Sequence, residues 1–332
     1  MKFEQIMQEL QRKVYQPIYF LCGEEEFFID QIADFIESNV LDEAEKEFNQ
    51  TVVYGRDVEI MELESTVKRY PMMASYNVVI VKEAQYLKKW DQLLSYIESP
   101  SDSSILVICH KHKKPDGRNA GVKALKKHAV YFESKKLYEN QVAQWIEHRV
   151  SATAYSIHPK AVQLLIEFLG TDLGKISNEI DKLTINLKSG ETIDAKIIEQ
   201  NIGISKDYNV FELNNALGSK DLLKANRIAQ HFGKNESAFP VPMILPTLYR
   251  FFAQLLLFKS LPAGNPKVAA SKLGINPYFI KDYQKAAQHY SQKKIAKIMA
   301  SLRKADIRSK GVGVDKLSND QLLQELVYEI LH

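Results

Sequence analysis

Short apolar runs alternate with segments of helical periodicity between residues 17 and 134. The run Val78-Val79-Ile80-Val81 is continuously apolar, as in a strand that is covered on both faces. Strands separated by helical segments predict crossover connections, and therefore a parallel sheet with helices. We predict strands at residues 18–22, 50–54, 78–81, 105–108 and 130–133, and helices at 27–39, 59–69, 89–98 and 120–128.

After residue 135 the strand pattern almost disappears, and apolar residues recur three and four positions apart. This spacing predicts helices at 141–150, 159–169, 173–187 and 195–202, and further helices from 209 to the C-terminus, interrupted at 219–221 and by a Pro-rich stretch at 239–246. The predicted fold class is an α/β N-terminal domain followed by two all-α domains. Their predicted ranges are 1–140, 141–208 and 209–332.

The composition is that of a globular chain without a strong overall charge. Of 332 residues, 45% are hydrophobic and 26% are charged, which excludes a disordered or low-complexity chain. The net charge of +3 is too small to indicate a nucleic-acid-binding protein. Cys22 and Cys109 lie far apart in apolar runs, which favours a reducing cytoplasm over a disulfide framework. Because neither a run of 18 apolar residues nor a signal-like N-terminus occurs, we expect neither export nor a membrane span.

The end of the first predicted strand is the place where an α/β domain would carry a phosphate-binding loop. Such a loop needs glycines, a lysine and a Ser or Thr. Gly23 is followed instead by Glu24, Glu25 and Glu26, whose charge would repel a polyphosphate. Lys82 stands at the end of the central strand, where an ATPase would carry a magnesium-organising Asp. We expect no cofactor, no metal and no catalytic residues.

The densest cluster of charge lies between residues 109 and 128, where seven cations oppose the single carboxylate of Asp116. Such a cluster is either a solvated face or a surface that neutralises phosphates, and the residues alone leave both interpretations open. His110 and His112 lie beside Cys109 without a further ligand at a supporting spacing, so we expect an exposed loop there rather than a metal site. The seven cations are Lys111, Lys113, Lys114, Arg118, Lys123, Lys126 and Lys127.

Two adjacent methionines, Met72 and Met73, follow a predicted amphipathic helix and precede the central strand, with Pro71 and Ala74 on either side. Methionine is flexible and polarizable. Such a pair therefore either fills the core or is presented to an apolar pocket on a partner. Both interpretations are open on the residues alone.

Several separated stretches resemble the delta subunits of the bacterial DNA polymerase III clamp loader. Their order and spacing along nearly the whole chain make the resemblance specific, although each is weak by itself. The stretches are the opening strand, Gly-Glu turn and helix at 19–29, the turn and central strand at 70–81, and residues 172–183, 208–213 and 305–311.

The resemblance implies a degenerate AAA+ domain, a small helical lid-like domain and a C-terminal helical collar domain. It also implies a subunit that does not hydrolyse ATP, but binds the ring-shaped sliding clamp (the beta subunit) and holds it open. The implied partners are subunits of the gamma/tau and delta-prime type, which supply ATP-driven switching, and primer–template DNA. In this family an apolar pair enters a pocket on the clamp, and Met72 and Met73 match its positions, where Leu and an aromatic residue are commoner.

Two other function classes compete with this interpretation. An active AAA+ ATPase would bind nucleotide, and the residues after Gly23 weigh against it. A free-standing nucleic-acid-binding protein would bind DNA with a steep salt dependence and would have no affinity for a clamp. We therefore expect a non-catalytic subunit of the DNA polymerase holoenzyme. Its clamp-binding residues would be Pro71, Met72, Met73 and Ala74, and its candidate DNA contacts are Lys111, Lys113, Lys114, Arg118, Arg308 and Lys310.

Overall fold

The computed structural model describes residues 1–203, 205–262, 264–311 and 318–332. Within them the chain forms two compact units, residues 1–137 and 138–332. The first unit is α/β and the second is almost entirely helical, which confirms the predicted fold class. The finer division of the helical part at residue 208 remains a prediction.

The first unit contains a five-stranded, wholly parallel sheet. Its central strands are buried along nearly their whole length, because helices cover both faces. The alternation of strands and helices in the sequence therefore predicted the sheet correctly. The order across the sheet is β2 (Gln50–Tyr54), β3 (Asn77–Lys82), β4 (Ser104–Lys111), β1 (Ile18–Gly23) and β5 (Val130–Ser134).

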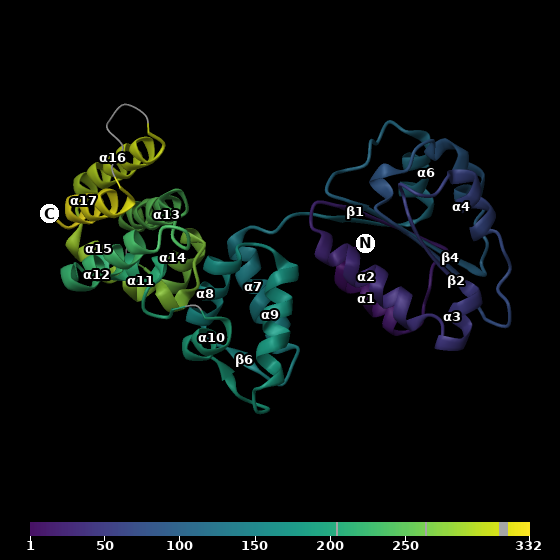
Figure 1. The fold of residues 1–332 in the computed structure, drawn as a ribbon, viewed down its shortest axis with the longest axis horizontal. Helices are drawn as coiled ribbons and strands as arrows, with labels where there is room; N and C mark the ends of the chain where they lie inside the picture. The colour runs from purple at the N-terminus through teal and green to yellow at the C-terminus, as the bar shows by residue number, and fades with distance from the viewer. Residues whose placement is uncertain (204, 263, 312–317) are drawn as a thin grey trace. The chain divides into compact units, whose positions relative to one another are not determined.

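Helices lie on both faces of this sheet (Figure 1). A cluster of buried hydrophobic side chains holds the helices on each face. On one face, α1 (Phe3–Gln11) and α2 (Glu26–Asn39) pack against side chains such as Leu21 and Ile80. The other face, which includes Phe20 and Val81, is covered by a second group of helices. That group is α4 (Ile60–Val67), η2 (Trp90–Leu93), α5 (Leu94–Glu98) and α6 (Ala120–His128).

Some local elements differ from the sequence prediction. The short helices α1 and α3 (Glu43–Asn49) and the turn η1 (Ala84–Tyr86) were not predicted, and the helix expected at 89–98 is divided into η2 and α5. The exposed loop expected at Cys109 and His110 is wrong, because both residues belong to β4 and are buried. β4 lies between β3 and β1, so these side chains are covered on both faces, and His110 Nδ1 lies 3.1 Å from the Lys113 carbonyl.

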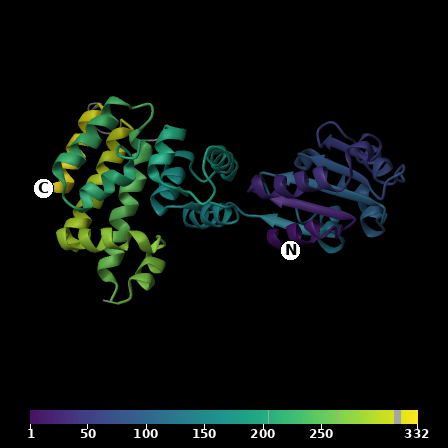
Figure 2. The same cartoon turned by 90° about the horizontal axis from the view of Figure 1, so that it is seen from below.

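The second unit is built of helices, apart from two short parallel strands, β6 (Ser156–Ile157) and β7 (Thr192–Ile193), that periodicity did not predict (Figure 2). The helices that precede residue 208 are α7 (Glu139–Ser151), α8 (Pro159–Leu169), α9 (Leu173–Ile185) and α10 (Ala195–Ile202). Those that follow are α11 (Val210–Gly218), α12 (Leu222–Lys234), α13 (Val241–Ser260), α14 (Pro266–Leu273), η3 (Pro277–Phe279), α15 (Ile280–His289), α16 (Gln292–Ser309) and α17 (Asn319–Leu331).

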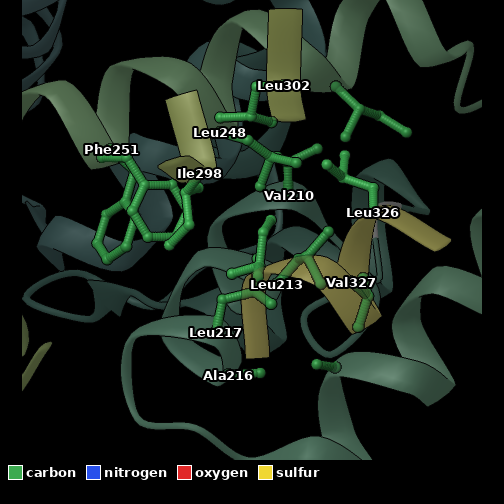
Figure 3. Close-up of a cluster of buried hydrophobic side chains, with 14 of the residues drawn as sticks. Val210, Leu213, Ala216, Leu217, Leu248, Phe251, Ile298, Leu302, Leu326 and Val327 are labelled. Carbon is green, nitrogen blue, oxygen red and sulfur yellow. The ribbon is translucent and has the colours of Figure 1, made fainter. Parts of the chain in front are cut away.

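Leu248 and Phe251 of helix α13 belong to the second unit's core, together with side chains of α11, α16 and α17 (Figure 3). In the described part of the chain α13 is the one helix long and apolar enough to cross a membrane. Seven of its side chains are buried in this core, which accounts for its apolar sequence in a globular unit. The Pro-rich stretch predicted an interruption at Pro246, but α13 continues through this residue. The same packing stabilises the helix there.

Candidate functional site

The loop that carries the two methionines, residues 68–76, connects α4 to β3 and is fixed at the α4 end. A helix leaves its last carbonyl groups without partners inside the helix. Here two side chains from neighbouring strands donate hydrogen bonds to these carbonyl groups. Asn77 Nδ2 donates to the Thr66 carbonyl at 2.8 Å, and Ser104 Oγ donates to the Val67 carbonyl at 2.7 Å. These hydrogen bonds therefore fix the position at which the loop begins.

The middle of the loop is held by Asn49, the last residue of α3. The Met72 amide donates to Asn49 Oδ1 at 2.6 Å, and Asn49 Nδ2 donates to the Met72 carbonyl at 3.0 Å. On the other side, Ala74 and Tyr76 pack against the core, and Tyr76 makes an edge contact with Tyr15. Asn49 was not predicted as a site residue, because its partner, Met72, lies 23 positions away in the sequence.

The fixed backbone presents both methionine side chains to solvent. Met72 is 64% exposed and Met73 is fully exposed, whereas Pro71 and Ala74 are half-buried. Met73 has a φ of 56°, in the left-handed region that non-glycine residues rarely adopt. Neither methionine belongs to a buried core cluster of the described residues. The core-filling interpretation of the pair is therefore wrong, and its chemistry suits an apolar pocket on another molecule.

The turn after β1 is too tightly enclosed for a phosphate loop. A Cβ added to Gly23 would lie 2.0 Å from the Ser134 carbonyl oxygen, and the Glu24 amide donates to that same oxygen. Glu25 caps α2 with its own carboxylate, which accepts from the Phe27 amide. The backbone groups that would cradle a phosphate thus face β5 and the carboxylates of α2.

Ion pairs close the neighbouring strand ends, where open α/β sheets bind their ligands. Lys111, at the end of β4, lies 2.6 Å from Asp30, and Lys82, at the end of β3, lies 2.9 Å from Glu37. Burial, together with the charge of Asp30, raises the pKa of Asp34, which lies between these pairs on α2. This arrangement neutralises the charges of the strand ends within the chain. Among the described residues, no group of three or more potential metal ligands occurs.

The candidate DNA contacts after β4 are largely engaged within the chain. Besides Lys111, Lys114 lies 2.6 Å from Glu133, whose pKa it lowers. Arg118 pairs with Asp116, and hydrogen bonds from Arg118 lower the pKa of Asp116 to about 2. Among the candidate cations of the described loop, Lys113 is the one without an ion pair in the structure.

The C-terminal candidates lie at the end of α16 and are also paired. Arg308 donates to Glu325 on α17 at 2.7 Å, and its side chain is mostly buried. Lys310 lies 2.7 Å from Asp306, one helical turn earlier. The six candidate cations are therefore present at two places in the fold, and five of them have a carboxylate partner.

The sheet and the strand ends together define a class of protein. A five-stranded parallel sheet with helices on both faces, followed by helical elements, is an AAA+-like architecture. In this chain the strand ends carry paired lysines and carboxylates in place of nucleotide-binding residues. The class is thus a protein with an AAA+-like fold whose strand ends are closed by ion pairs.

Comparison with known families gives the particular assignment. Residues 19–135 match the family model of the DNA polymerase III delta subunit, and residues 207–328 match the model of the C-terminal domain of that same family. The chain therefore belongs to the family of DNA polymerase III delta subunits, which are components of the clamp loader. This confirms the resemblance inferred from the separated sequence stretches.

Several individual proteins are similar to this chain. The chain is 26% identical over 332 residues to DNA polymerase III subunit delta of Bacillus subtilis strain 168, covering 97% of this chain and 94% of that one. The solved structure of the Bacillus subtilis DNA clamp loader delta protein has the same fold, with a TM-score of 0.55 at 23% identity over 99% of both chains. A Thermotoga maritima RuvB structure matches 85% of this chain and 83% of its own at 12% identity, with a TM-score of 0.34.

Proposed function

We propose that this chain binds the sliding clamp through Met72 and Met73 and holds the ring open during clamp loading. The observation that carries the proposal is the exposure of two adjacent methionines on a loop with a fixed backbone. Exposure of apolar side chains to water is unfavourable in free energy, and burial in a partner's pocket removes this exposure. Pro71 and Ala74, beside them, would line the edge of the contact.

Ring opening follows from differential affinity and needs no covalent step. If the chain binds the opened clamp more tightly than the closed clamp, binding shifts the ring toward the open form by the ratio of the two affinities. A protein that acts in this way does not itself need ATP. The enclosed turn at Gly23 and the paired Lys82 and Lys111 support a role without nucleotide.

The wider proposal places the chain in a cytoplasmic clamp loader with subunits of the gamma/tau and delta-prime type, acting at primer–template DNA. Within it, residues 1–140 would carry the clamp-binding loop, 141–208 a lid-like domain and 209–332 the collar that joins the other subunits. Membership of the delta family supports this assignment. DNA would be approached by the loop after β4 or by the end of α16, with Lys113 the cation of these candidates that has no carboxylate partner.

Binding of the purified chain to the sliding clamp of its own bacterium tests the proposal. We expect the variant Met72→Ala/Met73→Ala to bind at least about tenfold more weakly, which corresponds to ~1.4 kcal/mol, as for residues that anchor an interface. Its fold should be unchanged, because both side chains lie outside the core. Calorimetry or surface plasmon resonance gives the affinity, and circular dichroism the fold.

A matched control removes two other exposed methionines. Met61 on α4 and Met243 on α13 are 69% and 67% exposed, so Met61→Ala/Met243→Ala deletes the same chemistry elsewhere. We expect this control to bind like the wild type. Undiminished affinity of the Met72/Met73 variant would place the contact elsewhere, and a wild-type chain without affinity for the clamp would refute the proposal.

A further inference from the structure

Asn49 lies behind the methionine loop and belongs to a different element, α3. We propose that Asn49 is a positioning residue for clamp binding, which holds the backbone of Met72 in the conformation that the clamp recognises. This inference rests on the proposed function of Met72 and Met73. It adds a residue that does not contact the clamp itself.

The side-chain amide of Asn49 binds both its own helix and the backbone of Met72. Both of its N–H groups are used, one by the Glu45 carbonyl at 2.9 Å and one by the Met72 carbonyl, while its oxygen accepts from the Met72 amide. The residue is 2% exposed, so water does not compete for these bonds. Such a two-way contact with one residue's backbone fixes both its position and its orientation.

The loop has few other restraints at this point. Within the part of the chain that the structure describes, the two bonds to Asn49 are the hydrogen bonds that join residues 70–73 to another element. Met73 follows directly with a left-handed backbone, a conformation that persists only where the surroundings impose it. Asn49 is the described residue that fixes the backbone immediately before it.

Loss of this restraint reduces the population that can bind. If about one molecule in ten keeps the loop in the presented conformation, the apparent dissociation constant rises about tenfold, although no clamp contact has been removed. Without the restraint, both methionines can also fold back onto apolar surface of their own chain. The effect of Asn49 on affinity should therefore depend on the methionines.

The experiment compares clamp affinity and thermal unfolding for Asn49→Ala, Asn49→Asp and a control, Asn39→Ala. Asn39 is the last residue of α2, and its side chain likewise donates to the carbonyl four residues earlier, that of Phe35, at 2.9 Å. Unlike Asn49, it is exposed and makes no hydrogen bond to a loop of the described residues. We expect about tenfold weaker binding for Asn49→Ala and wild-type binding for Asn39→Ala. Asn49→Asp keeps the acceptor for the Met72 amide, but places a carboxylate oxygen against the Glu45 and Met72 carbonyls, so it should weaken binding at least as much as Asn49→Ala.

A double-mutant cycle separates positioning from a general effect on structure. Added to Met72→Ala/Met73→Ala, the Asn49→Ala change should weaken binding little further, because its effect acts through those side chains. Wild-type affinity of the Asn49 variants would overturn the inference and leave the proposed function intact, as would a loss that is the same with and without the methionines. If instead the methionine variant itself binds like the wild type, the proposed site fails, and the role of Asn49 fails with it.

Discussion

The half-buried carboxyl of Glu167, on α8, links two parts of the helical unit. It accepts hydrogen bonds from the amides of Val210 at 2.5 Å and Phe211 at 3.2 Å, in the first turn of α11. These bonds favour the ionised form, but burial outweighs them and, with a smaller effect from the nearby Glu212, raises the pKa of Glu167 to about 7. Glu167 therefore joins the predicted second and third domains by a contact whose strength should depend on pH.

Stability of the helical unit should therefore fall as pH rises toward neutrality. Because the pKa of Glu167 is about 7 when folded and 4.5 when unfolded, the folded state binds more protons between these values. The stabilisation is fully present below pH 4.5 and is lost as pH rises through 7, by on the order of 3 kcal/mol. Urea unfolding at several pH values should show this slope in the wild type and not in Glu167→Gln. The exposed Glu236→Gln serves as a control, and parallel profiles for all three proteins would contradict the assignment.

Sequence reasoning singled out those residues of the candidate site that are defined by their neighbours in the chain. Met72 and Met73 stood out because they precede a continuously apolar strand, and the resemblance to delta subunits matched them to the clamp-binding pair. Asn49 could not be found, because an Asn at the end of a helix is ordinary and its partner is 23 positions away. Likewise, the run from Lys111 to Lys114 left a solvated face and a phosphate-binding surface open, because the carboxylates that neutralise Lys111 lie on α2, far back in the sequence.

The helices that were predicted most accurately are those with strong signals at their ends. The predicted range of α6 is correct at both ends, and Asn119 caps it by accepting from the Gly121 and Val122 amides. Asp194 does the same for α10. In contrast, α3 is seven residues long, and its capping box of Asp42 and Glu45 stands before a mostly charged segment without an apolar stripe. Periodicity needs more turns than this to identify a helix.

The packing of α12 against α17 gives a prediction that belongs to these elements. A Cβ at Gly233 would lie 2.4 Å from Asp320 Oδ1 and 2.7 Å from Asp320 Cα, so Gly233→Ala must push α17 away. We expect this change to lower the free energy of unfolding by about 1–3 kcal/mol, as for overpacking elsewhere. A Cβ at Gly174 on α9 would have no atom closer than 3.4 Å. Gly174→Ala should therefore raise the free energy of unfolding by about 0.5 kcal/mol, because Ala has the higher helix propensity. Denaturant unfolding measures both, and equal effects of the two changes would show that the helix contact tolerates a side chain.

For the whole molecule, the pairing of charges matters more than their number. The net charge is +3, and five of the six candidate DNA contacts have a carboxylate within 4 Å. A phosphate that approaches Lys111 or Arg308 must replace an ion pair that already exists, so binding there gains little. The sequence could show that cations cluster, but the fold decides which of them are available.

The isolated chain should therefore bind primer–template DNA weakly and with a shallow salt dependence. Four exposed cations of the cluster between residues 109 and 128 have no ion pair within the described chain: Lys113, Lys123, Lys126 and Lys127. Each phosphate neutralised contributes about −0.9 to the slope of log affinity against log salt, so these four predict a slope no steeper than about −4. Fluorescence anisotropy with a labelled primer–template between 50 and 200 mM salt, roughly the range over which such slopes are defined, measures it. A slope of about −5 or steeper would mean that five or more phosphates are neutralised, and would favour a free-standing nucleic-acid-binding protein. A shallow slope together with tight clamp binding is the combination that a protein acting on DNA only within its assembly requires.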